Sequence, residues 1–351
     1  MPETAPLFKG IGYPVLQNRT FASRSEALAC ATGDIELTQD GRTGLVHNAA
    51  FESDLVVYDQ GYDNEQGHSQ AFRDHLLDVR RRIGTHFAGR KLLEVGCGKG
   101  LFLEMLIEAG FDVIGVDPSY TGDNPRVVRD FFGPELGVKA DCIVLRHVLE
   151  HIPNPVSFLR MIANANDGGL IYVEVPCLDW IAQKRAWFDI FYEHVNYFRL
   201  SDLEAMFGQV LAAERIFGGQ YLGIFADLAT LKSPSIEVTG PFRLPDGFLS
   251  GLKETAEALA GGDYAVWGGA SKGVVFSLLM SQYGLAPLLA IDINPAKQDR
   301  YMPVSGVGIV SPQVALASLG PGSSIVVMND NYLDEIRALA GDRFNLLTVT
   351  K

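Results

Sequence analysis

Two groups of residues in this chain have types and spacings suited to chemistry. Three glycines at alternate positions, Gly96, Gly98 and Gly100, follow a short apolar run and precede a helical pattern at 101–107. Glycines in a strand-to-helix turn adopt positive φ and let the backbone approach a nucleotide-like ligand closely. A Tyr-Glu-His triplet at 192–194 combines a phenol, a carboxylate and an imidazole, which are groups used in general acid–base catalysis. The sequence therefore predicts a ligand-binding turn, whereas an isolated triplet of this kind is more often an amphipathic segment with exposed polar groups.

The glycine turn belongs to a series of alternating strand and helix patterns. Apolar runs typical of buried parallel strands occur at 92–95, 112–117, 142–145 and 170–175. The alternation predicts an open parallel sheet with right-handed crossovers, in which ligands bind at the carboxyl ends of the strands. Asp117 ends the second run, at the position from which an acidic side chain binds ribose hydroxyls. A turn residue before Pro118 is the alternative interpretation.

Composition limits the class of protein. The 351 residues suggest two or three domains, and 47% hydrophobic residues suffice for a large core. The net charge of −13 argues against binding to nucleic acid or to an anionic membrane. The cysteines are dispersed without a CxxC pair, and the N-terminus lacks a signal-peptide pattern. We therefore expect free thiols in a cytoplasmic protein that contains no membrane span.

Three parts are predicted along the chain: an N-terminal region with a lid at 1–80, the main α/β domain at 81–235, and a second Rossmann-like α/β domain at 236–351. The polar, aromatic segment at 58–70 is typical of a lid or binding loop, with a solvated linker as the alternative. In the third part, Lys272 lies in a glycine-containing turn that could hold a diphosphate. A degenerate unit kept for packing is the alternative there.

Several details of the main domain resemble the class I S-adenosylmethionine-dependent methyltransferases. Glu94 stands just before the glycines, Asp117 ends the second strand, and Arg-His-Val-Leu-Glu-His-Ile at 146–152 follows the strand at 142–145. The resemblance covers about residues 90–180 and implies S-adenosylmethionine as cofactor. It implies that the glycines line its methionine and ribose portion and that Asp130 and Phe131 contact its adenine. The cofactor-binding residues that it implies are Glu94, Gly96, Gly98, Gly100, Asp117, Asp130, Phe131 and Arg146.

A narrower resemblance begins at residues 188–198, where the Tyr-Glu-His triplet is followed by an aromatic pair. This segment is similar to the sugar C-methyltransferases, which methylate a carbon of a nucleotide-linked keto-sugar. Segments at 58–69, 267–273, 291–298 and 329–336 are similar to the same family. Its members commonly begin with a cysteine-rich zinc module. Here the corresponding region has only Cys30, so we expect no metal site.

The narrower resemblance implies roles for individual side chains. Methylation next to a ketone requires removal of an α-proton, and His194 is the leading candidate for the base. Glu193 would orient the imidazole or bind a sugar hydroxyl, and Tyr192 would donate to the enolate oxygen. His151 is a second candidate acid or base, with a histidine satisfied by backbone as its alternative.

The remaining substrate contacts are predicted from the lid and the third part of the chain. Tyr62 and Ser69 would reach the acceptor from the lid, although Ser69 is also placed to cap the helix that follows it. Lys272 would bind the diphosphate of a nucleotide-linked sugar. For an isolated Tyr-Glu-His triplet, the alternative is an amphipathic segment with exposed polar groups.

Two other functions stay open at this stage. The same donor could serve an O-methyltransferase that acts on a sugar or another small hydroxyl compound. The chain could also be a non-catalytic nucleotide-binding protein. A nicotinamide-dependent reductase is disfavoured because the second glycine turn is imperfect. The oligomeric state is left open.

Overall fold

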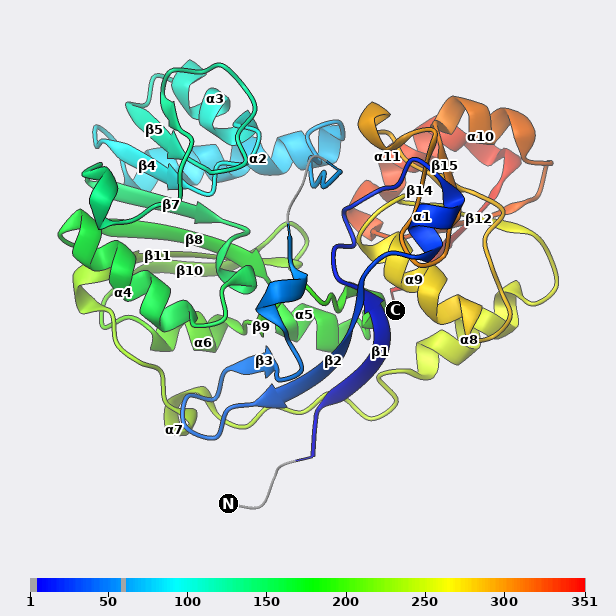
Figure 1. The fold of residues 1–351 in the computed structure, drawn as a ribbon, viewed down its shortest axis with the longest axis horizontal. Helices are drawn as coiled ribbons and strands as arrows, with labels where there is room; N and C mark the ends of the chain where they lie inside the picture. Colours follow the sequence, from blue (N-terminus) through cyan, green and yellow to red (C-terminus); the bar gives the residue numbers. More distant parts are fainter. Residues whose placement is uncertain (1–4, 58–60, 351) are drawn as a thin grey trace.

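The computed structural model describes residues 5–57 and 61–350 and contains three sheets. Figure 1 shows two lobes, one built mainly from the cyan and green segments and one from the yellow to red segments. The blue N-terminal strands run along the lower side and lead from one lobe to the other (Figure 1). The predicted α/β class is confirmed. Residues 58–60, which begin the predicted lid segment, lie outside the described residues.

The first lobe is built on a seven-stranded sheet with the order β10-β11-β8-β7-β4-β5-β6. Its strands are β4 (Leu92–Val95), β5 (Val113–Val116), β6 (Val127–Val128), β7 (Cys142–Arg146), β8 (Leu170–Pro176), β10 (Val210–Ile216) and β11 (Tyr221–Asp227). Its helices are α2 (Gln70–His86), α3 (Leu101–Glu108), α4 (Pro155–Asn166), α5 (Leu178–Gln183) and α6 (Leu200–Ala205).

The central strand β4 shows why this sheet forms. All four of its residues are buried; Leu93 and Val95 join one core cluster, whereas Leu92 joins another. A strand that is covered on both faces buries every residue, and three of these four residues are apolar, with Glu94 as the exception. From β4 the chain proceeds to β5 on one side and later to β7 on the other, so the strand order reverses here. In open α/β sheets, ligands bind at such a reversal, in the region outside the carboxyl ends of the strands, and this region beside β4 and β7 is here called the crevice.

The antiparallel pair β10 and β11, which the sequence analysis did not predict, forms the edge beside β8. A dinucleotide-binding Rossmann sheet is parallel at this position. The boundary expected after residue 80 falls inside α2, and α2 packs on this sheet through Leu76, Val79 and Ile83. Helix α2 therefore belongs to the first lobe.

A four-stranded antiparallel sheet joins the N-terminal region to the catalytic candidate segment. Its strands, in the order of the sheet, are β1 (Phe8–Pro14), β2 (Thr32–Gln39), β3 (Val46–Asn48) and β9 (Asn196–Tyr197), with α1 (Arg24–Leu28) between β1 and β2. Strands β2 and β3 pair antiparallel as a hairpin. Because β3 pairs with β9, the N-terminal hairpin fixes the residues just after His194.

The second lobe holds a six-stranded sheet with the order β14-β15-β13-β12-β16-β17, parallel except for β14. Its strands are β12 (Tyr264–Trp267), β13 (Ala290–Ile291), β14 (Arg300–Tyr301), β15 (Gly308–Val310), β16 (Ser324–Val327) and β17 (Asn345–Thr348). Its helices are α8 (Ser250–Leu259), α9 (Lys272–Ser281), α10 (Pro312–Ser318) and α11 (Leu333–Ala340), and α7 (Ile236–Thr239) lies in the connection before it. Among the helices of residues 5–57 and 61–350, none has the length and apolarity to cross a membrane.

The two lobes meet at a buried ion pair. Lys272 Nζ at the start of α9 lies 2.7 Å from Asp189 Oδ2, and both side chains are at most 11% exposed. The ammonium also lies 4.8 Å from the ring centre of Trp180. Removing one member of such a pair leaves a buried charge without its partner, which is costly.

We predict that Lys272→Ala lowers the free energy of unfolding by about 3 to 5 kcal/mol, because it leaves the buried Asp189 carboxylate without its cation. Urea denaturation would measure the change. Lys253→Ala is the matched control, since the Lys253–Glu257 pair is exposed. Its loss should lower the free energy of unfolding by less than about 1 kcal/mol. A similar, small effect of both substitutions would contradict the structural role of Lys272.

Candidate functional site

The glycine turn lies at the carboxyl end of β4, facing the crevice. Gly96, Gly98 and Gly100 have φ values of 76°, 55° and 84°, a region that disfavours other residues. A Cβ on Gly96 would come within 2.4 Å of Val148, whereas a Cβ on Gly98 would have nothing within 4 Å. Gly96 thus permits close packing, and Gly98 adjoins open space that a ligand can fill.

Asp117, at the end of β5, holds this turn in place. Its Oδ2 accepts a hydrogen bond of 2.8 Å from the backbone N–H of Gly98. Its Oδ1 accepts from the backbone and the hydroxyl of Ser119, at 2.8 and 2.6 Å. The carboxylate is thereby fixed beside the glycines, where the resemblance expects a ribose-binding group.

Asp130 and Phe131 follow the edge strand β6, further along the same end of the sheet. The Asp130 side chain accepts a hydrogen bond from the backbone N–H of Phe131 at 2.8 Å. The Phe131 ring is 77% exposed, which is unusual for an aromatic side chain. An exposed aromatic face at this edge is suited to stacking on a planar group.

Glu94 is the buried acidic group under the glycine turn. It is 2% exposed, and its Oε2 has no hydrogen-bond partner among the described residues. Burial raises the pKa of Glu94 to about 7, although the positive charge of Arg146 opposes the shift. A buried acceptor without a donor is a natural place for a polar ligand group to bind.

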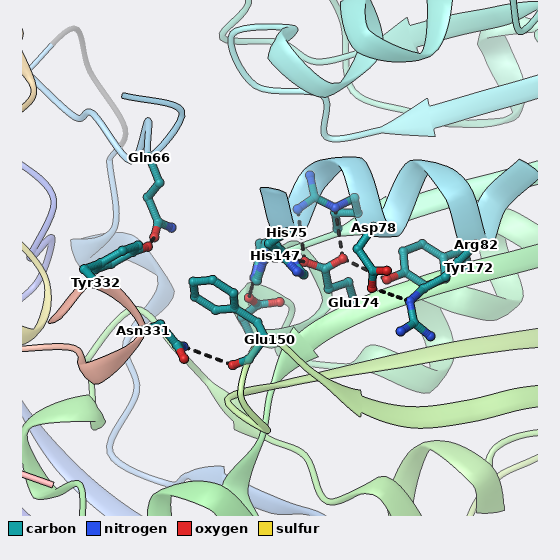
Figure 2. Close-up of polar contacts among 12 residues, drawn as sticks. Gln66, His75, Asp78, Arg82, His147, Glu150, Tyr172, Glu174, Asn331 and Tyr332 are labelled. Carbon is teal, nitrogen blue, oxygen red and sulfur yellow. Dashed lines mark hydrogen bonds and ion pairs between the residues drawn. The ribbon is translucent and has the colours of Figure 1, made fainter. Parts of the chain in front are cut away.

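Glu174 in β8 is the centre of a buried polar cluster, and Figure 2 shows His75, His147 and Tyr172 pointing toward it. Its carboxylate accepts bonds of 2.8 Å from Tyr172, 2.9 Å from His75 and 3.1 Å from His147. The Arg146 guanidinium donates two further hydrogen bonds to this carboxylate, at 3.1 and 3.0 Å. Burial would raise the pKa of Glu174, but Arg146 and the two histidines hold it well below its usual range. The glutamate is thus ionised and fully paired.

His147 links this cluster to the crevice. Its backbone has a φ of 52°, so the chain turns sharply after β7. One ring nitrogen faces Glu174, and the other lies 3.3 Å from Oε1 of Glu150 in the short helix η3 (Leu149–His151). Burial disfavours the charged imidazole, but the bonds to Glu150 and Glu174 prevail and raise the pKa of His147 to about 9. A charged His147 therefore fixes the position of Glu150.

The structure gathers four of the predicted site residues, although they are far apart in the sequence. The Nδ1–H of His151 donates to the backbone carbonyl of Glu193 at 3.0 Å. The hydroxyl of Tyr62 donates to Oε2 of Glu193 at 3.0 Å. The rings of His151 and His194 are 4.9 Å apart and nearly perpendicular. Tyr62, His151, Glu193 and His194 thus form one polar group, here called the acceptor cluster.

His194 is held as a neutral imidazole in this cluster. Burial lowers its pKa well below the usual value, and the nearby His151, His147 and Lys272 lower it further. A neutral ring carries the lone pair that a proton acceptor needs.

Tyr192, another predicted site residue, lies in different surroundings from the acceptor cluster. The Tyr192 hydroxyl accepts from the backbone N–H of Glu52 at 2.9 Å, and its ring packs 5.5 Å from Phe51. Tyr192 is therefore directed to the N-terminal region, where it packs against β2 at Gly33. The hydroxyl is thus engaged outside the acceptor cluster, and the role of Tyr192 as a donor to the enolate stays a prediction.

Ser69 and Lys272 make contacts between parts of the chain. Ser69 caps α2, as expected, by accepting from the backbone of Phe72, and its hydroxyl donates to Glu335 in α11 at 2.7 Å. Lys272 is committed to Asp189. Neither side chain is presented as a substrate contact in this arrangement, because both are engaged in joining the two lobes.

The second glycine turn repeats the first but is filled by the chain itself. The Gly269 N–H donates to Asp292 at 3.0 Å, as Gly98 does to Asp117. A Cβ on Gly269 would come within 2.8 Å of Ile309, however. Ser271 is bonded through its backbone to Gln17 and through its hydroxyl to Asn18. These contacts favour the packing alternative for this turn.

Sequence reasoning missed Glu174, His75 and Glu150 as members of the site. One signal was available for Glu174, because a glutamate stands inside the otherwise apolar strand pattern at 170–176. A carboxylate at such a position must find buried partners. His75 lies on the apolar face of α2, where no pattern distinguishes it from a core residue.

Glu94 leads to a prediction about stability and pH. Its pKa of about 7 in the folded state exceeds the unfolded value of 4.5, so the folded state holds the proton more tightly. Stability should therefore fall as pH rises from 4.5 to 7, by about 3 kcal/mol in total. In Glu94→Gln this loss should be absent, so that the variant is the more stable protein at pH 8. Urea denaturation of the ligand-free protein at pH 5 and pH 8 would test this. Glu104→Gln, on the exposed face of α3, is the control, and an unchanged pH dependence in Glu94→Gln would contradict the assignment.

Comparison with known proteins agrees with this geometry. Residues 68–210 match the family model of a methyltransferase domain. A ubiquinone biosynthesis O-methyltransferase of Aliivibrio fischeri is 31% identical over 103 residues, which cover 24% of this chain and 43% of that protein. The corresponding Ruegeria pomeroyi protein is 33% identical over 97 residues, covering 23% and 39%. The chain thus spans less than half the length of these relatives.

Solved structures resemble the same region weakly. A 1,6-didemethyltoxoflavin-N1-methyltransferase of Burkholderia thailandensis has a TM-score of 0.34 at 17% identity, covering 45% of this chain and 80% of that one. A SAM-dependent methyltransferase of Archaeoglobus fulgidus has a TM-score of 0.33 at 18% identity, covering 47% and 100%. The domain match, the sheet order and the glycine turn fixed by Asp117 agree with one another. Within residues 68–210 the chain carries a methyltransferase domain.

Proposed function

We propose that the protein transfers a methyl group from S-adenosylmethionine to the carbon next to the ketone of a nucleotide-linked sugar, through an enolate. The observation that carries this proposal is the acceptor cluster beside the crevice. It presents a neutral imidazole, His194, together with a carboxylate and a phenol. Those are the groups needed to remove an α-proton and to bind a polyhydroxylated acceptor.

The crevice offers a fit for the donor. Gly98 adjoins open space, Glu94 has an unused acceptor oxygen, and Phe131 offers an exposed aromatic face. Asp117 would bind the ribose hydroxyls, and the glycine turn would border the methionine portion. When bound, the donor supplies an electrophilic methyl group.

The protein's own groups would handle the proton. His194 accepts the α-proton of the acceptor on a ring nitrogen, and the bonding electrons pass to the enolate. His151, held by the carbonyl of Glu193, adjoins the charged imidazole that results. Tyr62 binds the Glu193 carboxylate and so connects the lid region to the base. Glu193 is buried, whereas His194 is partly exposed and is therefore accessible to an acceptor.

A second candidate is methyl transfer to oxygen. It is favoured by one observation, since the curated relatives named above are O-methyltransferases. A hydroxyl acceptor would also need a base near the donor, and His194 or His151 could supply it. It would not need a neighbouring ketone.

The test incubates the full chain with S-adenosylmethionine and a panel of nucleotide-linked keto-sugars and hydroxy-sugars. Mass spectrometry would report the gain of one methyl group, and NMR would locate it. Methylation of carbon in a keto-sugar supports the proposal. Methylation of oxygen, or donor binding without any transfer, contradicts it.

We predict that His194→Asn lowers the turnover number by about 10² to 10⁴-fold, because it removes the base. Donor affinity, measured by calorimetry, should change less than about threefold, since His194 lies on the acceptor side. His68→Asn is the matched control, because His68 is exposed and outside the cluster. Unchanged turnover in His194→Asn would exclude His194 as the base.

A further inference from the structure

Glu150, His151 and His194 bring together three side chains of the kinds that bind transition metals. One potential ligand atom from each lies within 4.8 Å of the other two. Glu150 and His151 come from η3, after β7, whereas His194 comes from the segment before β9. Their spacing matches no metal-binding motif, so only the fold makes this group visible.

Glu150 supplies an independent sign that a ligand belongs here. Its side chain is 1% exposed, and its Oε2 has no hydrogen-bond partner among the described residues. Its other oxygen lies 3.3 Å from His147 Nδ1, which fixes the carboxylate in place. A buried acceptor oxygen left unsatisfied is unfavourable, and a cation would satisfy it.

The hydrogen bond of His151 sets its tautomer. A backbone carbonyl only accepts, so the bond from Nδ1 to Glu193 requires the proton on Nδ1 and leaves the lone pair on Nε2. Histidines that bind metals characteristically donate their other N–H to a carbonyl or carboxylate in this way. The Glu193 carboxylate, 3.7 Å from the same nitrogen, adds negative charge close by.

His194 has ring contacts in place of hydrogen bonds. Its ring lies 4.9 Å from those of Phe191 and His151. Within residues 5–57 and 61–350, neither of its nitrogens has a hydrogen bond. One nitrogen can therefore turn toward the other two ligands at little cost.

We propose that Glu150, His151 and His194 bind a divalent transition metal ion, Zn²⁺ above all, and that the bound ion prevents His194 from acting as the base. Two imidazoles and one carboxylate are a ligand set that zinc uses, with water as the fourth ligand. Ligand atoms at about 2.1 Å from one ion are about 3.4 Å apart in tetrahedral geometry, so the three must approach by a little over 1 Å. Imidazole ligands disfavour Mg²⁺ and Ca²⁺, which prefer oxygen.

Metal binding and catalysis exclude one another because they use the same lone pair of His194. The inhibitory part rests on the proposed function, whereas metal binding does not. Zinc should therefore inhibit methyl transfer, and a chelator should restore it.

Calorimetric titration of ZnCl₂ into the chelator-treated full chain, without donor or acceptor, tests the binding. One site per chain is expected, with affinity lowered at least tenfold in both Glu150→Gln and His194→Asn. Titration with CoCl₂ gives a second readout, since cobalt bound to nitrogen ligands absorbs visible light. If the ion bound elsewhere, a variant that is merely destabilised would still show this absorption band. His68→Asn is the control and should bind as the unaltered protein does. Absence of binding, or equal binding by all variants, would overturn the proposal.

Inhibition is tested separately, with whichever acceptor the panel identifies. Loss of turnover at zinc concentrations near the measured dissociation constant, reversed by EDTA, supports the exclusive use of His194. Activity that EDTA abolishes would overturn it, because the ion would then be required. If no acceptor is methylated, the proposed function fails while the calorimetric result stands by itself.

Discussion

The arrangement of the site depends on one buried carboxylate, Glu174. It stands in the middle of an apolar strand and is fully buried. Burial of an ionised carboxylate is very costly unless the carboxylate is paired. Its partners come from three places: Tyr172 from the same strand, Arg146 and His147 from the end of β7, and His75 from α2. One anion thereby fixes the helix against the sheet and sets the backbone where the crevice begins.

The consequences extend outward from Glu174 along a chain of contacts. His147, charged between two carboxylates, turns the backbone after β7 and holds Glu150. Glu150 and His151 share one short helix, so both lie together just after the carboxyl end of β7. The Nδ1–H of His151 donates to the Glu193 carbonyl, and this bond connects η3 to the segment that carries His194.

The second support of the site comes from outside the methyltransferase domain. The N-terminal hairpin pairs β3 with β9 and fixes the chain just after His194, and Tyr62 reaches Glu193 from the lid region. The second lobe holds the same segment from the other side through the Lys272–Asp189 pair. The acceptor cluster is thus held by contacts from all three parts of the chain, whereas the glycine turn and Asp117 lie within one domain.

That division explains what the amino-acid sequence by itself determined. The glycine turn, Asp117, Glu94 and the parallel strands were predictable because they are local: a strand, a turn and the next strand's end specify them by spacing alone. The fold class followed from that pattern, and so did the position of Asp117 beside the glycine turn. The same local logic correctly placed Ser69 as a helix cap.

Only the tertiary structure decided the acceptor side. Tyr192 and Lys272 have the right chemistry for a substrate contact, but packing directs one to Glu52 and commits the other to Asp189. The second glycine turn resembles a ligand site in sequence, yet Ile309 and Asn18 fill its surroundings. Conversely, Glu150, His151 and His194 carry no common motif and meet only because two separate segments converge. Local spacing specifies a turn, but a group built from distant segments depends on side-chain packing, which no spacing in the sequence encodes.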